Sequence, residues 1–330
     1  IMGDLPAERV QPARPFINCG VDFCGPVLIK SSLLRKSKSV KSYIALFICL
    51  ATKAIHVELV SDMSTSAFIN ALKRFYARRG KSRHMYSDNG SNFVGASREL
   101  NQYLKEVMKD SLLSNYVVSE QITWHFIPPR APHFGGIWES AIKSLKFHLK
   151  RVVGDATISF EEMCTVLSMI EACLNSRPLI PLTNNPDDLS VITPGHFLIG
   201  DSLTAMVEPD MRPYKEGHLK RWARLQKMYQ HFWDRWSQEY LSHLQARQKW
   251  SVQQPNLPLN KLVLIKEDNM PPLKWNLGRI IETHPGKDGF VRVASVRTAD
   301  GIYKRPISKL CPLPDHEEES NSTDSNLEDC

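Results

Sequence analysis

Gly20-Val21-Asp22-Phe23-Cys24-Gly25-Pro26 is an apolar run of strand length that carries one carboxylate. An ionised carboxylate that is buried alone is very costly, so such a group pairs with a cation or binds a metal. Two more carboxylates stand at comparable places: Asp88 follows the short run 84–87, and Glu139 begins a predicted helix. If the three converge, they repel one another until a divalent cation binds them. Their oxygen ligands suit Mg²⁺ or Mn²⁺, and a two-metal carboxylate site is a common means of attack on a phosphodiester.

The segments around these carboxylates predict an α/β layered domain. Strands are expected at 16–29, 43–50, 54–60, 83–87 and 122–127, and helices at 64–80, 96–112, 137–153 and 159–176. Ser64 is the expected cap of the first helix and Gly80 its end. The first three strands should form an antiparallel meander. The order favours a ribonuclease H-like fold, a mixed five-stranded sheet covered by helices in which the first and fourth strands lie side by side.

The remainder of the chain predicts a different organisation. Residues 1–15 are expected to be a linker, 16–180 the catalytic core, 181–254 a loop and Trp-rich helical region, 255–314 a small β-barrel that binds DNA, and 315–330 a disordered acidic tail. A long helix is predicted over 214–250, because apolar residues recur there at helical spacing. Short strands are expected at 262–266, 278–283, 291–297 and 301–306.

The charge distribution indicates a polyanionic partner. The 330-residue chain has a net charge of +7, and seven of its acids lie in 315–330, which contains no Lys or Arg. The other residues carry 42 bases against 28 acids, a charge of +14. Such a basic body favours nucleic acid. No apolar stretch is long enough to cross a bilayer, and the odd number of cysteines, seven, favours free thiols over a disulfide framework.

Several stretches resemble the motifs of retroviral and retrotransposon integrases. Ser87-Asp88-Asn89-Gly90-Ser91-Asn92-Phe93 resembles the motif of the second catalytic Asp. Pro128-Pro129-Arg130-Ala131-Pro132-His133-Phe134-Gly135-Gly136-Ile137-Trp138-Glu139 resembles the glutamate motif, and residues 20–26 resemble the first-Asp motif. Residues 44–60, which include Cys49-Leu50-Ala51-Thr52-Lys53-Ala54, are most similar to the Pao/BEL class of long-terminal-repeat retrotransposons. The resemblance covers nearly the whole chain.

This resemblance implies a DNA integrase, a polynucleotidyl transferase and endonuclease in which Asp22, Asp88 and Glu139 are the catalytic and metal-binding residues. Such an enzyme uses two Mg²⁺ or Mn²⁺ ions to process the 3′ ends of the element's double-stranded DNA and to join them to target DNA. It is expected to work as a homo-oligomer in the nucleus, after synthesis in the cytoplasm from a polyprotein, and to have no membrane partner. The interval between Asp88 and Glu139 holds 50 residues, longer than in the familiar retroviral pattern, and residues 101–121 absorb the excess.

Five residues near the carboxylates are candidate DNA contacts. Lys143 and Lys146 share a helix face with Glu139, because they follow it by four and seven residues. Integrases carry lysines at these places, although solvated helix lysines would show the same spacing. Asn89 and Asn92 could orient Asp88 or contact DNA, but turn chemistry alone also explains Asn89-Gly90. His133 could contact substrate or be an ordinary loop histidine.

Two other functions compete with an active integrase. A ribonuclease H-type nuclease usually has a fourth carboxylate on the helix after the third strand, and residues 67–79 contain none. Glu58, which could be mistaken for it, is predicted to lie on the outward-facing side of its strand. The second alternative is a host-retained, catalytically silent protein that binds DNA or chromatin. The presence of all three carboxylates argues against it.

Overall fold

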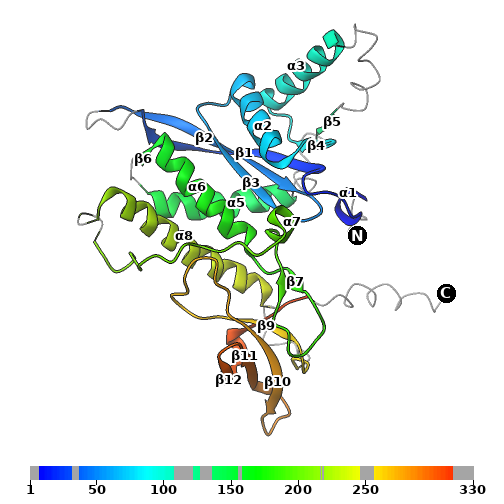
Figure 1. Cartoon of the computed structure of the whole chain (residues 1–330), viewed down its shortest axis with the longest axis vertical. Helices are drawn as coiled ribbons and strands as arrows, with labels where there is room; N and C mark the ends of the chain where they lie inside the picture. Colours follow the sequence, from blue (N-terminus) through cyan, green and yellow to red (C-terminus); the bar gives the residue numbers. More distant parts are fainter. Residues whose placement is uncertain are drawn as a thin grey trace, which may run out of the picture. The chain divides into compact units, whose positions relative to one another are not determined.

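The protein is described by a computed structural model (Figure 1). The structure describes residues 7–31, 37–107, 122–126, 136–154, 158–215, 217, 219–245 and 256–314, with the backbone alone at 7, 104–107 and 136–140. The chain divides into two compact units. The first falls within 1–175, 197–201 and 210–232, and the second within 176–196, 202–209 and 233–330.

The first unit is a mixed sheet with helices. In chain order it contains α1 (Ala7–Val10), β1 (Asn18–Lys30), β2 (Ser39–Cys49), β3 (Ile55–Val60), α2 (Thr65–Arg79), β4 (His84–Ser87), α3 (Ser91–Val107), β5 (Thr123–Phe126), α5 (Gly136–Val153), β6 (Ile158–Ser159) and α6 (Phe160–Asn175). The predicted caps of α2 are confirmed. The Ser64 hydroxyl accepts the N–H of Ala67 at 3.2 Å, and Gly80, at φ +81°, ends the helix. The predicted helix at 96–112 begins earlier than expected, at Ser91, directly after the Asn89-Gly90 turn.

The sheet brings the two aspartate-bearing strands together. Its strand order is β3-β2-β1-β4-β5. The meander β1, β2 and β3 is antiparallel, whereas β4 pairs in parallel with both β1 and β5. The predicted neighbourhood of the first and fourth strands is therefore confirmed. The sheet has six strands where five were predicted, because the two-residue strand β6 pairs in parallel with the far end of β1.

Each face of this sheet is covered by different helices. Successive side chains of a strand point to opposite faces. Cys19, Val21 and Met85 belong to the core on the α2 side, together with Phe68 and Phe75 of that helix. The alternate positions of β1 and β4 point to the other face, where α5 packs against β1 and α6 against β3. Figure 1 shows α2 and α3 on one side of the sheet and α5 and α6 on the other.

The prediction that Glu58 faces outward is wrong. Both α2 and α6 pack against β3, so every residue of the strand is buried and Glu58 is 6% exposed. Its carboxylate accepts hydrogen bonds from Arg74 Nε and Arg78 Nη1, each at 2.7 Å, and lies 3.2 Å from His56 Nε2. On the other side of the imidazole, His56 Nδ1 lies 3.1 Å from Glu171 of α6. Glu58 is thus part of a buried ionic cluster, not of a solvated strand face.

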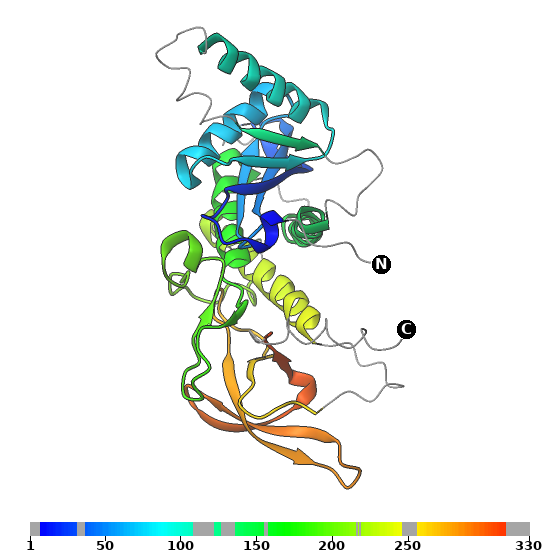
Figure 2. The same cartoon turned by 90° about the vertical axis from the view of Figure 1, so that its right-hand side faces the viewer.

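The second unit contains a five-stranded antiparallel sheet. Its elements are β7 (Ile180–Pro181), β8 (Val191–Ile192), β9 (Leu262–Ile265), β10 (Leu277–Pro285), β11 (Val291–Thr298), β12 (Gly301–Pro306), the short 3-10 helix η3 (Ile307–Lys309) and β13 (Leu310–Pro312). The strand order is β12-β11-β10-β9-β13. A small β-barrel was predicted here; the structure has the β-sheet, and among the described residues no ladder joins β12 to β13 to close it. Figure 2 shows its long β10–β11 hairpin in orange.

The predicted long helix is shorter than expected. The helix α8 (Arg221–Leu244) follows a segment that contains Gly217, a poor helix former, and residues 246–250 lie outside the described part. The short helix α7 (His196–Ile199) precedes it. In the second unit, Trp275 contacts Trp233, Trp236 and Tyr240 of α8 edge to face, with ring centroids 4.9 to 5.9 Å apart. Trp275 is therefore a packing residue rather than an exposed stacking platform.

The state of the cysteines and the length of the helices are known for the part of the chain that the structure describes. The six cysteines located there are free thiols, and five of them are buried. None of the helices in the described ranges is long and apolar enough to cross a bilayer. The predicted acidic tail at 315–330 lies outside the described residues.

Candidate functional site

Asp22 and Asp88 stand at the same level of two neighbouring strands. Gly20 of β1 is the register partner of Tyr86 of β4 in a parallel ladder. Asp22 follows Gly20 by two residues, and Asp88 follows Tyr86 by two residues. Because side chains alternate along a strand with a period of two, both positions continue the face that α5 covers. The register therefore directs both predicted carboxylates toward the same face of the sheet.

The turn after β4 holds the Asp88 carboxylate. Asp88 Oδ1 accepts the N–H of Gly90 at 2.9 Å. A Cβ atom at Gly90 would lie 2.7 Å from Asn92 Oδ1 and 3.0 Å from Asp88 Oδ1, which is closer than real contacts allow without a shift. A side chain at position 90 would therefore displace Asn92 or the Asp88 carboxylate. Asn92 is buried and Asn89 exposed, so of the two amides Asn92 lies beside the carboxylate and Asn89 faces solvent.

The third predicted site residue belongs to helix α5, which packs against β1. Glu139 lies in the first turn of this helix, and its side chain is outside the described residues. Buried Ile142 and Leu145 form the apolar face of α5, while Lys143 and Lys146 are exposed. Burial raises the pKa of the Cys24 thiol to about 11, while the positive charge of Lys146 lowers it. Lys146 therefore lies within electrostatic reach of the segment of β1 that carries Asp22.

Asp22 and Asp88 are carboxylates, the ligands that Mg²⁺ and Mn²⁺ prefer. Within the described residues, which leave out the side chain of Glu139, no group of three His, Cys, Asp or Glu side chains is placed to hold a metal. His133 likewise lies outside the described part.

Sequence reasoning missed four polar or aromatic residues on this same face. They are Asn18 on β1, His84 and Tyr86 on β4, and His125 on β5. His84 and Tyr86 precede Asp88 by four and two residues, so the period-two pattern of the strand could have placed them beside it. The position of His125 could not be found this way, because it depends on how β5 pairs with β4.

In the second unit several basic residues are engaged within the protein, so fewer of them can contact DNA phosphates than the sequence implies. Lys261 and Arg279 are buried, and Arg279 donates to the backbone oxygens of Thr183, Asp188 and Asn260, each at 2.9 Å. Arg292 and Arg305 pair with Asp288 and Glu267. Exposed Lys274, Lys287 and Lys304 remain as candidate phosphate contacts.

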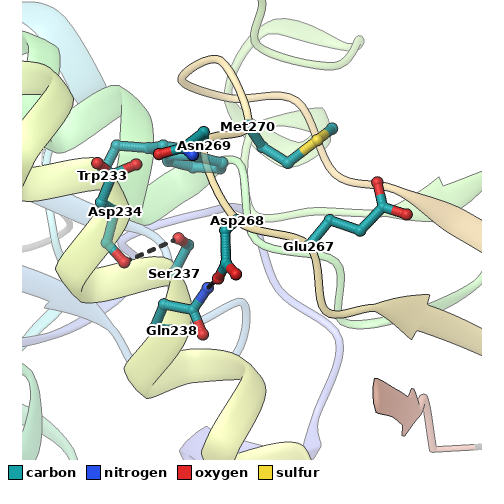
Figure 3. A pocket seen from close by; sticks show the side chains of 8 residues that line it. All are labelled: Trp233, Asp234, Ser237, Gln238, Glu267, Asp268, Asn269 and Met270. Carbon is teal, nitrogen blue, oxygen red and sulfur yellow. Dashed lines mark hydrogen bonds between the residues drawn. The ribbon is translucent and has the colours of Figure 1, made fainter. Parts of the chain in front are cut away.

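A pocket of about 290 Å³ also lies in the second unit (Figure 3). Its lining consists of Trp233, Asp234, Ser237, Gln238, Glu267, Asp268, Asn269 and Met270. Gln238 donates to Asp268 across it at 3.4 Å, as Figure 3 shows. Three of the lining side chains are acidic and none is basic, so the pocket is unsuited to a phosphate.

Comparison with known proteins adds a partial match. The model of a family of unknown function (DUF5641) matches residues 220–313, which span α8 and the C-terminal sheet. No curated protein matches the chain. Among solved structures, the simian T-cell lymphotropic virus intasome in complex with PP2A regulatory subunit B56 gamma is similar at 12% identity and a TM-score of 0.38. That match covers 95% of this chain and 84% of that chain. At this TM-score the likeness carries no argument about fold or function.

Proposed function

We propose that this protein is a metal-dependent DNA integrase of the D,D,E type, with a ribonuclease H-like core, from a Pao/BEL-type retrotransposon. The observation that supports it best is the parallel register of β1 and β4, in which Gly20 pairs with Tyr86, two residues before Asp22 and Asp88 respectively. The helix α5 packs against β1, and Glu139 lies in the first turn of that helix.

The chemistry follows from these three carboxylates. They would hold two Mg²⁺ or Mn²⁺ ions, which activate the attacking oxygen and stabilise the leaving oxygen when bound. The turn at Gly90 fixes one oxygen of Asp88, so this carboxylate is oriented before any ligand arrives. Lys143 and Lys146, exposed on α5, would contact the phosphates of the strand beside them. The nucleobases of that DNA strand would then lie next to the neighbouring strands β4 and β5.

The partners and location follow from the same proposal. The substrates are the two ends of the element's double-stranded DNA and a target duplex, and a homo-oligomer would hold both ends. The protein would work in the nucleus after synthesis in the cytoplasm from a polyprotein. The sheet of the second unit would add weak DNA binding without sequence preference, through Lys274, Lys287 and Lys304.

A ribonuclease H-type nuclease is less well supported. The helix α2 follows the third strand and carries no acidic residue. Glu58, the strand carboxylate that could be mistaken for a fourth metal ligand, is neutralised by His56, Arg74 and Arg78 in the buried cluster. It is therefore unavailable as a fourth metal ligand. If the wild type neither cleaves nor joins DNA in the test below, the alternative is a catalytically silent DNA-binding protein.

The test compares the wild type with Asp88→Asn and with Asp300→Asn, an identical change at an exposed aspartate of the second unit. Each full-length protein is incubated with Mn²⁺, labelled duplexes that carry the element's terminal repeats, and a target plasmid. We expect Asp88→Asn to abolish 3′-end cleavage and strand transfer without changing the circular dichroism spectrum, and Asp300→Asn to keep both reactions. Cleavage by Asp88→Asn at the wild-type rate would show that the assignment is wrong.

A further inference from the structure

A group of side chains next to Asp88 is not used by the proposed chemistry. His84 and Tyr86 alternate along β4 with Met85 and Ser87, which are both fully buried on the α2 side. His84 and Tyr86 are only partly buried, and they share the face and strand of Asp88. They therefore form a row that leads along β4 to the predicted metal site.

Two neighbouring strands complete the group. His125 of β5 is the register partner of Tyr86, and its ring stacks on the tyrosine ring with centroids 4.6 Å apart and planes 11° from parallel. His125 Nε2 also lies 3.1 Å from His84 Nδ1. On the other side, Asn18 of β1 is the register partner of His84. These four residues are contiguous on three adjacent strands.

Asn18 presents an acceptor that the described part of the chain does not satisfy. It is 8% exposed, and its Nδ2 donates to the backbone oxygen of Glu8 at 3.4 Å. Its Oδ1 has no hydrogen-bond partner among the described residues. Buried polar atoms are nearly always paired. Because this oxygen has almost no solvent-exposed area, an N–H donor of a ligand would reach it, beside His84, only after the Asn18 side chain turns outward.

The Tyr86 and His125 rings stack nearly parallel to each other. Burial and the neighbouring His84 lower the pKa of His125. Stacked aromatic rings attract another flat ring rather than a phosphate. An amide acceptor at their edge suits the exocyclic amine of a base, since asparagine oxygens accept such groups in DNA recognition.

We infer that Asn18, His84, Tyr86 and His125 form a subsite for one unpaired nucleobase of the strand whose phosphate lies at Asp88. The inference rests on the proposed function. Asp88 follows Tyr86 by two positions, which corresponds to about 6.6 Å along a β-strand. Successive nucleotides of one DNA strand lie about 3.4 Å apart along the duplex. The bound base therefore belongs to the nucleotide one or two positions from the reacting phosphate. It must leave the duplex stack to reach the Tyr86 and His125 rings.

The test measures binding without chemistry. Full-length protein in EDTA, which also removes any metal from the two imidazoles, is titrated into two 30-base-pair probes. One probe is blunt, and the other carries 2-aminopurine in two unpaired nucleotides at one 3′ end. We expect the wild type to bind the unpaired end more tightly and to quench its fluorescence by stacking. Tyr86→Ala should lose about 5- to 30-fold in affinity for the unpaired end only, about 1–2 kcal/mol of base–aromatic stacking.

Two control variants make the result specific. Tyr86→Phe keeps the ring and should retain the quenching, while Tyr103→Ala removes an exposed tyrosine from α3 and should match the wild type. Equal losses on both probes, or unchanged quenching in Tyr86→Ala, would overturn the inference. Metal-dependent cleavage is measured in parallel. Quenching that depends on Tyr86 in a protein that never cleaves would refute the proposed function and support the subsite, whereas cleavage without such quenching would refute the subsite alone.

Discussion

Replacing Glu171 tests whether the buried ionic cluster holds the first unit together. Its carboxylate accepts the backbone N–H of Val57 at 2.9 Å, contacts His56 Nδ1 at 3.1 Å and pairs with Arg79. Burial raises the pKa of Glu171, but the hydrogen bond and charge of His56, the Val57 N–H and the charge of Arg79 together outweigh this effect, so the net pKa is lowered. Removing the carboxylate leaves a buried imidazole and a buried N–H without their partner.

Breaking one side of a buried ion pair costs about 3–5 kcal/mol. For a unit of this size, Glu171→Ala should lower the melting temperature by about 6–20 °C. Glu171→Gln should cost less, because an amide oxygen can still accept from Val57. The control is Glu161→Ala on an exposed position of the same helix, which should stay within about 0.5 kcal/mol of the wild type.

The assay is urea unfolding followed by hydrogen exchange, read by mass spectrometry on peptides that cover β3 and α6. This readout reports the first unit separately from the second. We expect Glu171→Ala to increase exchange at residues 55–60 and to lower the unfolding midpoint. If Glu171→Ala matched Glu161→Ala in both measurements, the cluster would not contribute to stability and the reasoning would be refuted.

Three more outcomes follow from the structure. Gly90→Ala should reduce Mn²⁺ affinity and cleavage with an unchanged melting temperature, because a Cβ would displace Asn92 or the Asp88 carboxylate; wild-type cleavage would contradict this. Lys143→Gln with Lys146→Gln should weaken DNA binding and flatten its log–log salt dependence by roughly one unit per lost phosphate contact, and an unchanged slope would mean that both lysines are only solvated. Burial lowers the pKa of His56, but hydrogen bonds to Glu171 and Glu58 raise it overall. Its contribution to stability is therefore complete below pH 6.5 and lost as pH rises through the raised pKa, so urea midpoints should fall above pH 6.5 in the wild type and stay flat in His56→Gln.

The parts of the fold that follow from local chemistry could be predicted from the sequence. Ser64 and Gly80 mark the ends of α2 because a hydroxyl cap and a left-handed residue act within one turn. The adjacency of β1 and β4 followed from the order of the elements. The third carboxylate, Glu139, was placed at a helix start, and the helix is there.

The parts that depend on distant segments could not be predicted. The alternation of β3 suggested that one face of this strand is exposed, but the helices α2 and α6 both pack against it. Glu171, the partner of His56, lies 115 residues away in the sequence. The stacking of His125 on Tyr86 depends on the pairing of β5 with β4. These strands are far apart in the sequence, with His84 and His125 separated by 41 positions, and the sequence pattern does not determine register over such a separation. Whether a five-stranded sheet closes depends on the twist and stagger of all its strands, so the regular strand spacing in the second unit did not settle closure.

The central claim is that Asp22, Asp88 and Glu139 share divalent cations at the edge where β1 and β4 meet α5. The most direct measurement is anomalous diffraction from crystals of the full-length protein soaked in Mn²⁺. The account predicts anomalous peaks about 2.1 Å from carboxylate oxygens of both Asp22 and Asp88, absent in Asp88→Asn crystals. Mn²⁺ bound only elsewhere in the wild type, with no peak between these two aspartates, would contradict it.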